Sequence, residues 1–294
     1  MLLILDCNFL AHRAKFAMKN VELSYERQKT EVIFNFMQQI YQLAITFRPR
    51  VWAFIWDSKK NFRKKIYPEY KAGRAKSEKT PEDIALDKVA YPQFTRLRTE
   101  VLPGLGFKNI FVQFGYEGDD VIASVVMGYN KKFGGATMVA SDEDLFQLLS
   151  YANMYNPITK VTTTAKSFTE KWGITPKEWG RVKAIAGCGG GKNQSGDNVN
   201  GIEGVGNKTA AKYINETLKE TTKAYKEIKS DEGQKIIERN EPVVVLPFKG
   251  TAEFELVKHP LYSQDFLAMW DKLGFQLYNK PDVFKGWVKE FRLK

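Results

Sequence analysis

Short apolar runs, separated by helical patterns, dominate the first half of the chain. Four runs are predicted to be strands, at 2–5, 51–56, 109–113 and 137–140. Between them, 30–47 repeats apolar residues at helical spacing, and 81–101 does so behind Thr80 and Pro81, which are typical of a helix start. Short runs that are apolar on both faces are typical of buried parallel strands. We therefore expect an α/β fold whose central, mostly parallel sheet is flanked by helices.

Acidic residues stand where these predicted strands end or where a following helix begins. They are Asp6, Asp57, Glu117, Asp119, Asp120, Asp142 and Asp144. Each alone is most simply a solvated or helix-capping residue. In parallel sheets, however, ligand sites lie beyond the carboxyl ends of the strands. Carboxylates crowded there repel one another, and a divalent cation with oxygen ligands relieves that repulsion, so the pattern predicts one metal site.

Composition narrows the chemistry further. The 294 residues carry a net charge of +11, which favours polyanionic partners, although solubility alone would also explain it. Two distant cysteines and two histidines do not support a disulfide framework, a zinc site or a histidine-based catalytic site. No stretch of 18 apolar residues and no basic n-region are present, so we expect no membrane span, no signal peptide and a cytoplasmic protein.

A basic tract follows Asp57. Residues 58–80 are rich in lysine and arginine, poor in aliphatics, and carry Tyr67, Pro68 and Tyr70. Two interpretations stay open for this tract. It is either a solvated loop or an element that closes over a strand of nucleic acid, with aromatic rings that stack on bases.

Glycine-rich segments mark the second half of the chain. Residues 176–187 have a helical pattern, and 187–196 is expected to be a flexible loop. Gly204-Val205-Gly206 then predicts a hairpin between two helices, where exposed N–H groups and Lys208 would hold a phosphate. Alone, such a pattern is usually only a turn. Residues 215–294 carry no diagnostic motif, and their aromatic-rich end predicts core packing or a docking helix.

The motifs, taken in order, resemble the flap endonuclease and 5′-3′ exonuclease family, in particular its phage and bacterial branch. The resemblance covers about residues 1–215. The matching segments are Leu3-Ile4-Leu5-Asp6, Asp57 with F-R-x-x-x-Y-P-x-Y-K-x-x-R at 62–74, Glu117-Gly118-Asp119-Asp120, Ser141-Asp142-x-Asp144, and Gly196-Asp197 with the glycine hairpin up to Thr209.

This resemblance implies a PIN-like 5′-nuclease core at 1–175, with a helical arch at about 58–100. A helix-three-turn-helix duplex-binding region and a C-terminal segment packed on the core would occupy 176–294. It also implies two-metal phosphodiester hydrolysis with Mg²⁺ or Mn²⁺. The tighter metal site is assigned to Asp6, Asp57, Glu117 and Asp119, and the second to Asp120, Asp142, Asp144 and Asp197.

The resemblance also implies roles for basic, aromatic and glycine residues. Lys71 and Arg74 are expected to contact the scissile phosphate, and Tyr70 to stack on the terminal base. Arg63 and Lys64 would guide the single strand. Gly204, Gly206 and Lys208 would hold the duplex, with a K⁺ ion at this helix-hairpin element.

The implied function is a monomeric, structure-specific 5′ nuclease that removes primers or flaps during replication, beside unidentified replication proteins. Its substrate would be DNA or RNA/DNA with a 5′ single strand and a duplex, which includes RNase H-like activity. One departure concerns Cys188, which stands where the family has an acid. A thiol is a poor ligand for Mg²⁺, so either the second metal position is weaker or Cys188 is a loop residue without a role.

Three other functions are compatible with parts of this pattern. The first is a catalytically weakened or inactive nucleic-acid-binding protein on the same scaffold. A toxin-type ribonuclease fits less well, because such domains lack the basic arch and the glycine hairpin. A small-molecule metal phosphatase has no need for so many exposed cations.

Overall fold

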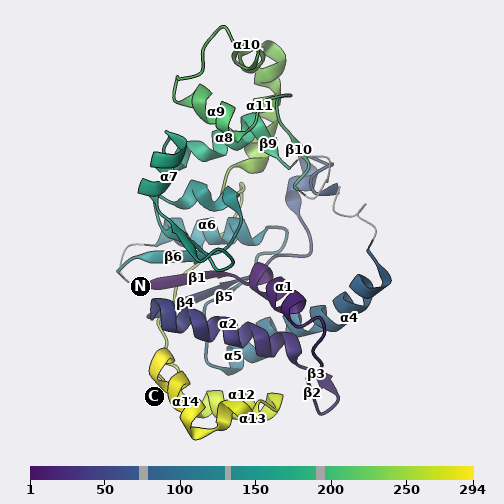
Figure 1. The fold of residues 1–294 in the computed structure, drawn as a ribbon, viewed down its shortest axis with the longest axis vertical. Helices are drawn as coiled ribbons and strands as arrows, with labels where there is room; N and C mark the ends of the chain where they lie inside the picture. The colour runs from purple at the N-terminus through teal and green to yellow at the C-terminus, as the bar shows by residue number, and fades with distance from the viewer. Residues whose placement is uncertain (73–78, 130–133, 190–195) are drawn as a thin grey trace.

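A six-stranded sheet forms the centre of the molecule (Figure 1). The structure is a computed structural model that describes residues 1–72, 79–129, 134–189 and 196–294. The strand order is β5-β4-β1-β6-β7-β8, and all neighbouring pairs are parallel except β7 with β8. The strands are β1 (Leu2–Asp6), β4 (Val51–Ile55), β5 (Ile110–Phe111), β6 (Ala136–Val139), β7 (Asn153–Asn156) and β8 (Val161–Thr163). The predicted α/β fold with a mostly parallel sheet is therefore confirmed.

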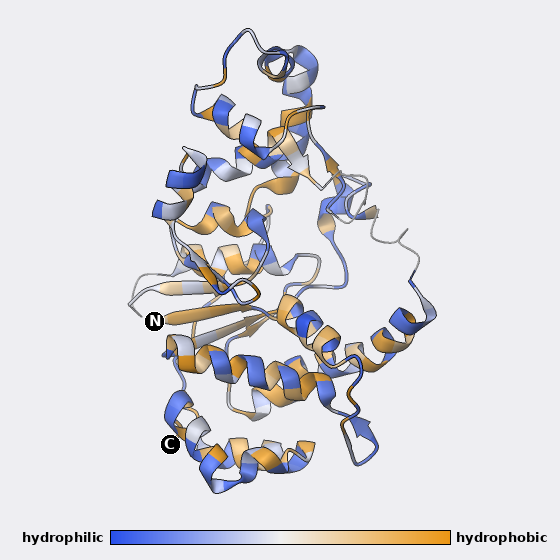
Figure 2. Ribbon diagram, viewed as in Figure 1, coloured by the Kyte–Doolittle hydropathy of each residue, from blue (hydrophilic) through white to orange (hydrophobic). Residues whose placement is uncertain are grey.

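Strand β1 is central because its side chains are apolar on both faces. It pairs Leu2 with Val51 on one side and with Ala136 on the other. Side chains alternate across a strand. Leu2 and Ile4 accordingly pack in one hydrophobic core, whereas Leu3 and Leu5 pack in a second core on the opposite face. Figure 2 shows β1 as one of the most hydrophobic segments of the ribbon.

Helices cover both faces of the sheet. One face is covered by α1 (Cys7–Ala17), α2 (Glu31–Phe47), α4 (Pro81–Arg96), the π-helical η2 (Leu97–Val101), α5 (Leu102–Gly104), α12 (Ser263–Leu273), α13 (Gln276–Asn279) and α14 (Pro281–Phe291). The other face is covered by α6 (Gly118–Gly128), η3 (Glu143–Leu148), α7 (Ala165–Trp172), η4 (Pro176–Glu178), α8 (Trp179–Ala186), α9 (Asn207–Ile214), α10 (Lys223–Lys229) and α11 (Asp231–Val244). Within the described residues, none of the helices combines the length and apolar character that crossing a bilayer requires.

The helix predicted behind Thr80 begins as its sequence indicates. The Thr80 hydroxyl accepts a hydrogen bond from the Asp83 N–H, and the Asp83 carboxylate accepts one from the Thr80 N–H, which makes a capping box. Pro81 occupies the first helical position, where its missing N–H costs nothing. Helix α4 therefore begins at Pro81, within the segment that is predicted to form an arch, and residues 73–78 lie outside the described residues.

The predicted loop at 187–196 is in part a small sheet. β9 (Gly187–Cys188) pairs antiparallel with β10 (Val199–Asn200), and residues 190–195 lie outside the described residues. A Cβ atom on Gly201 would lie 2.1 Å from the Ala186 carbonyl carbon. Glycine at position 201 therefore permits a close backbone crossing at the end of α8. Two further short strands, β2 (Ser24–Tyr25) and β3 (Gln28–Lys29), form a hairpin after α1.

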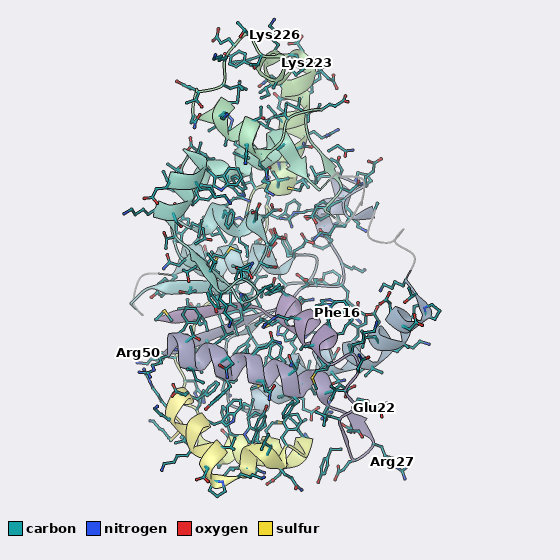
Figure 3. All side chains as sticks on the ribbon, viewed as in Figure 1. Phe16, Glu22, Arg27, Arg50, Lys223 and Lys226 are labelled. Carbon is teal, nitrogen blue, oxygen red and sulfur yellow. The ribbon has the colours of Figure 1, made fainter. Side chains whose placement is uncertain are left out.

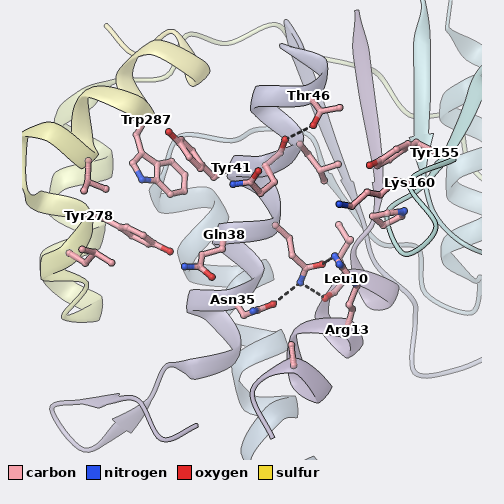
Figure 4. Close-up of a pocket in the computed structure, with 17 residues that line it drawn as sticks. Leu10, Arg13, Asn35, Gln38, Tyr41, Thr46, Tyr155, Lys160, Tyr278 and Trp287 are labelled. Atoms are coloured by element: carbon pink, nitrogen blue, oxygen red, sulfur yellow. Dashed lines mark hydrogen bonds between the residues drawn. The ribbon is translucent and has the colours of Figure 1, made fainter. Parts of the chain in front are cut away.

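The aromatic-rich C-terminal end packs on the core, as one of its two interpretations predicts. Trp270, Trp287 and Phe291 are buried in the same core as α2. In Figure 4 the Trp287 ring lies beside Tyr41 of α2, and their ring centroids are 4.7 Å apart. A cavity of about 750 Å³ remains beside this contact, between α1, α2 and the last helices.

Candidate metal and nucleic-acid site

The parallel register of the strands brings four acidic segments to one edge of the sheet. Asp6 pairs with Ile55 at the ends of β1 and β4, so Asp57 follows at the same edge. The Gly118 N–H donates to the Asp57 carboxylate over 2.6 Å, which holds the start of α6 against it. Asp6 also caps α1, because its carboxylate accepts a hydrogen bond from the Phe9 N–H over 2.9 Å.

Glu117 and Asp197 meet although 80 residues separate them. The Tyr70 hydroxyl lies 2.7 Å from a carboxylate oxygen of each. The Lys71 ammonium contacts Glu117 and lies 3.5 Å from Asp197. In addition, the Lys71 N–H donates to the Asp197 carbonyl oxygen over 2.8 Å. The basic tract is therefore attached directly to the carboxylate cluster.

Asp144 has a cation and a thiol beside it. The Lys183 ammonium of α8 lies 2.8 Å from one Asp144 oxygen, and the Cys188 thiol lies 3.6 Å from the other. Cys188 is thus a buried residue of β9 that contacts Asp144, and not a loop residue as one interpretation expected. Burial, followed by the charge of Asp144, raises the pKa of this thiol well above its usual range, so it stays protonated.

The carboxylates perturb one another's protonation. Burial raises the pKa of Asp6 to about 7, and the charge of Asp57 contributes to this shift. Burial also raises the pKa of Asp119, with contributions from Asp142 and Asp6. Asp142 is exposed at the surface, but neighbouring protein groups reduce the hydration of its carboxylate, and this effect, followed by the charge of Asp144, raises its pKa to about 6. Each of these acids therefore lies within the electrostatic field of several others.

The donor set fits a hard divalent cation, because seven carboxylates face one region and such ions prefer oxygen ligands. These are Asp6, Asp57, Glu117, Asp119, Asp142, Asp144 and Asp197. A cleft of about 10 Å³ between Glu117, Asp144 and Asp197 is near the smallest volume that admits one water. Among the described residues, no three acids, cysteines or histidines already converge closely enough to hold an ion, and Lys71 and Lys183 pair with Glu117 and Asp144 of the cluster.

The structure corrects the assignments of Asp120 and Arg63. Asp120 is fully buried, and its two oxygens accept from both terminal nitrogens of Arg63, at 2.5 and 2.7 Å. They also accept from the N–H groups of Phe248 and Glu117. Asp120 therefore has no free oxygen for a metal. Arg63 is only 2% exposed, so it cannot guide a strand of nucleic acid from the surface.

The predicted stacking role of Tyr70 is also at odds with the structure. Tyr70 is 3% exposed, and its ring packs in the core beneath the cluster. It orients Glu117 and Asp197 through its hydroxyl instead. Lys71 lies at the cluster, and its contact with the scissile phosphate stays a prediction. Lys64 is exposed, and Arg74 lies outside the described residues.

The glycine hairpin, where a phosphate site is predicted, has an open backbone. Gly204 has a φ of +74°, and Gly206 caps the start of α9. A Cβ atom on either glycine would meet no atom within 4 Å, so the backbone is open to a ligand. Lys208 is exposed in the first turn of α9.

Two residues of the site, Asn8 and Lys183, were not predicted from the sequence. The Asn8 side-chain oxygen accepts from the Asp57 N–H over 2.9 Å and so links the first two strand ends. Lys183 pairs with Asp144. A signal for Lys183 was present, because a single cation in the apolar segment 182–186 requires a partner when the helix is buried.

Comparison with known proteins agrees with this geometry. The family described as 5′-3′ exonuclease, N-terminal resolvase-like domain, matches residues 1–173. DNA polymerase I of Thermus thermophilus is 32% identical over 216 residues, which are 73% of this chain and 24% of that protein. DNA polymerase I of Deinococcus radiodurans is 33% identical over 220 residues, 73% of this chain and 21% of that protein. The chain thus spans less than a quarter of the length of these relatives.

Solved structures share the fold at lower identity. The bacteriophage T5 5′-exonuclease, solved with bound divalent zinc ions, has a TM-score of 0.68 and 22% identity, covering 84% of this chain and 89% of that one. The bacteriophage T5 flap endonuclease in complex with DNA and metal ions has a TM-score of 0.69 and 20% identity, covering 97% and 98%. Because the family match extends over more than half of the chain, this protein belongs to the 5′-3′ exonuclease family with the N-terminal resolvase-like domain.

Proposed function

We propose that this protein is a structure-specific 5′ nuclease that hydrolyses phosphodiester bonds near junctions between single strand and duplex, in primer or flap removal. One observation carries the proposal: seven carboxylates gather at one strand edge, directly beside a basic tract. The carboxylates supply oxygen ligands, and the lysines supply sites for phosphates.

The metal requirement belongs to the same proposal. Asp6, Asp57, Glu117 and Asp119 would hold one Mg²⁺ or Mn²⁺ ion. Asp142, Asp144 and Asp197 would hold a second. Bound there, such ions lower the pKa of a water and stabilise the leaving oxygen. Asp120 is left out of both sets, because Arg63 already uses its oxygens.

The chain's own residues position the substrate. Lys71 pairs with Glu117 and Asp197 here, and a substrate phosphate offers its ammonium an alternative anionic partner at the same place. The open backbone at Gly204 and Gly206, with Lys208, would hold a duplex phosphate without reading sequence, and a K⁺ ion would fit the same hairpin. We extend the proposal to a monomer acting on DNA or on RNA/DNA 5′ strands.

One observation favours an alternative, a weakened nuclease that chiefly binds nucleic acid. Cys188 and Lys183 both lie against Asp144, so the second metal position has fewer free carboxylate oxygens than an all-acid site. Metal-dependent turnover separates the two functions. Binding without turnover is expected of the alternative only.

A labelled 5′-flap substrate with Mg²⁺ tests the proposal. Wild type should cut near the junction, and excess chelator should abolish cutting while duplex binding remains. Asp142→Ala should lower the rate by about 100-fold or more, since it removes a ligand at the reacting phosphate. Asp282→Ala is the matched control, because Asp282 is an exposed acid of α14, among the C-terminal helices of the opposite core. Absence of cutting by wild type, or equal rates for the two variants, would refute the assignment.

A further inference from the structure

A basic cavity lies at the edge of the sheet opposite the carboxylate cluster. Its volume is about 480 Å³, and its basic residues are Arg50, Lys108, Lys258, His259, Arg292 and Lys294. Arg50 directly precedes β4 and Lys108 precedes β5, so the cavity adjoins the amino ends of the strands. The carboxylates follow the carboxyl ends of the same strands. Figure 3 shows Arg50 beside the C-terminal helices, on the side where β1 begins in Figure 1.

The cavity concentrates positive charge, and the Asp265 carboxylate lies behind its wall at Gly106. None of the residues that line it is acidic, and within the described part of the chain none of its lysines or arginines forms an ion pair. The neighbouring Glu290 is used by Arg48 and Lys289 instead. Burial, together with the charges of Arg50 and Arg292, lowers the pKa of the Met1 amine, as expected in a positive field. Cations gathered from separate chain segments repel one another, and an anionic ligand would relieve that repulsion.

The walls of the cavity are better suited to a peptide than to nucleic acid. Its three aromatic residues, Trp52, Phe107 and Phe291, are at most 7% exposed. The rings of Trp52 and Phe291 stack on each other, with centroids 5.4 Å apart. These three rings therefore offer no open face for a base to stack on, as single-strand binding sites typically do, and the exposed ring in the lining is the small imidazole of His259.

The backbone along the cavity offers hydrogen-bonding groups to a peptide. Residues 253–260 have no helix or strand and, within the described part of the chain, make no hydrogen bond to other backbone groups. The Asn109 side chain anchors this segment, because it accepts from the Val257 N–H at 2.7 Å and donates to the Val257 carbonyl at 2.9 Å. The adjoining N–H and C=O groups of Lys258 and His259 can pair with the main chain of an extended ligand.

We propose that this basic cavity binds an acidic peptide segment of a partner protein. Carboxylates of the segment would pair with the cations, and its main chain would lie along residues 257–260. The site is separate from the nuclease site, so the proposal does not depend on the proposed catalytic activity.

Fluorescence anisotropy with a labelled peptide of alternating aspartate and valine tests this site in the full chain. Wild type should bind the peptide at physiological ionic strength, and a serine-for-aspartate version should not bind. Lys108→Glu/Lys258→Glu should weaken binding by about tenfold or more, because two attractive charges become repulsive. Both side chains are exposed, and thermal melting will show that the variant folds.

Lys171→Glu/Lys177→Glu is the charge-matched control, since both lysines are exposed and lie around α7 and η4, on the other core. It should bind the peptide as wild type does. Equal weakening in both double variants, or no binding by wild type, would overturn the proposal. A single-stranded oligonucleotide that binds more tightly than the peptide, and that loses this binding in Lys108→Glu/Lys258→Glu alone, would overturn it in favour of a nucleic-acid site.

Discussion

At the scale of single residues, the charges of the carboxylate cluster repel one another. Asp6 has a pKa raised to about 7 and Asp142 one raised to about 6, both chiefly by burial. A carboxyl whose pKa is higher in the folded state binds its proton more tightly there than in the unfolded chain. The stabilisation that the protonated carboxyl gives the fold is therefore complete below about pH 4, which is its pKa in the unfolded chain. This stabilisation is lost as the pH rises through the pKa of the folded state.

The first prediction concerns this pH dependence. Asp6→Asn removes the charge but keeps an N-cap for α1, since asparagine also accepts the Phe9 N–H. Without metal, this variant and wild type should have similar free energies of unfolding at pH 4. At pH 8 the variant should be more stable by about 3 kcal/mol, because wild type must ionise Asp6. Urea unfolding in chelator measures the difference, with Asp282→Asn as control, and a gap that does not change with pH would contradict the argument.

The second prediction concerns Lys71. Because its ammonium contacts Glu117 and lies near Asp197, we expect Lys71 to contact the reacting phosphate rather than the duplex. Lys71→Ala should lower single-turnover cleavage of a flap by about 100-fold while duplex affinity changes little. Lys285→Ala is the matched control, since Lys285 is an exposed lysine of α14, in the core opposite the carboxylate cluster. A larger loss in affinity than in rate would assign Lys71 to binding alone.

At the scale of elements, the Arg63–Asp120 pair joins three parts of the chain. Arg63 lies in η1 (Phe62–Lys65), Asp120 lies in α6, and the Arg63 Nε donates to the Val243 carbonyl at the end of α11 over 2.7 Å. The pair therefore sets the foot of the basic tract against the helix that carries Glu117 and Asp119. Its role is to position the site rather than to bind metal.

The third prediction follows from the burial of the Arg63–Asp120 pair. Arg63→Met leaves Asp120 charged and without its partner in the interior, which should lower the free energy of unfolding by about 3–5 kcal/mol. Lys64→Met, at the next and exposed position, should change it by less than about 0.5 kcal/mol. Chemical denaturation measures both variants. Similar values for the two would show that the pair contributes little.

The same pair shows where sequence reasoning reached its limit. The apolar runs predicted β1, β4 and β6 well, because buried strands need apolar side chains on both faces. The polar strand β7 was not predicted, since its composition differs little from that of a loop. Asp119 and Asp120 are adjacent and identical, and a helix turns them to different sides. Only the fold shows that Asp120 faces Arg63, 57 residues earlier, while Asp119 faces the cluster.

At the scale of the whole molecule, the sheet separates two cores that have different tasks. The core beneath the carboxylates includes the hairpin region and α11, and the opposite core includes α2 and the C-terminal helices. The predicted family is confirmed over 1–173, yet this match ends before either core is complete. The C-terminal helices carry no family motif, and their aromatic residues predicted only that they pack.

The last prediction tests whether that packing is required for folding. A chain ending at residue 260 would lose Phe266, Trp270 and Trp287, which are at most 1% exposed, and would uncover Trp52 and Phe107 on the sheet face. Each such aromatic contributes about 3–5 kcal/mol when removed from a core, and typical domains have a total stability of only about 5–15 kcal/mol. The truncated chain should therefore lose its cooperative thermal transition and its near-ultraviolet circular dichroism. Lys285→Ala, an exposed substitution within α14, should retain both signals. A cooperative transition in the truncated chain would instead mean that helices α12, α13 and α14 are not required for folding and that residues 1–260 fold alone.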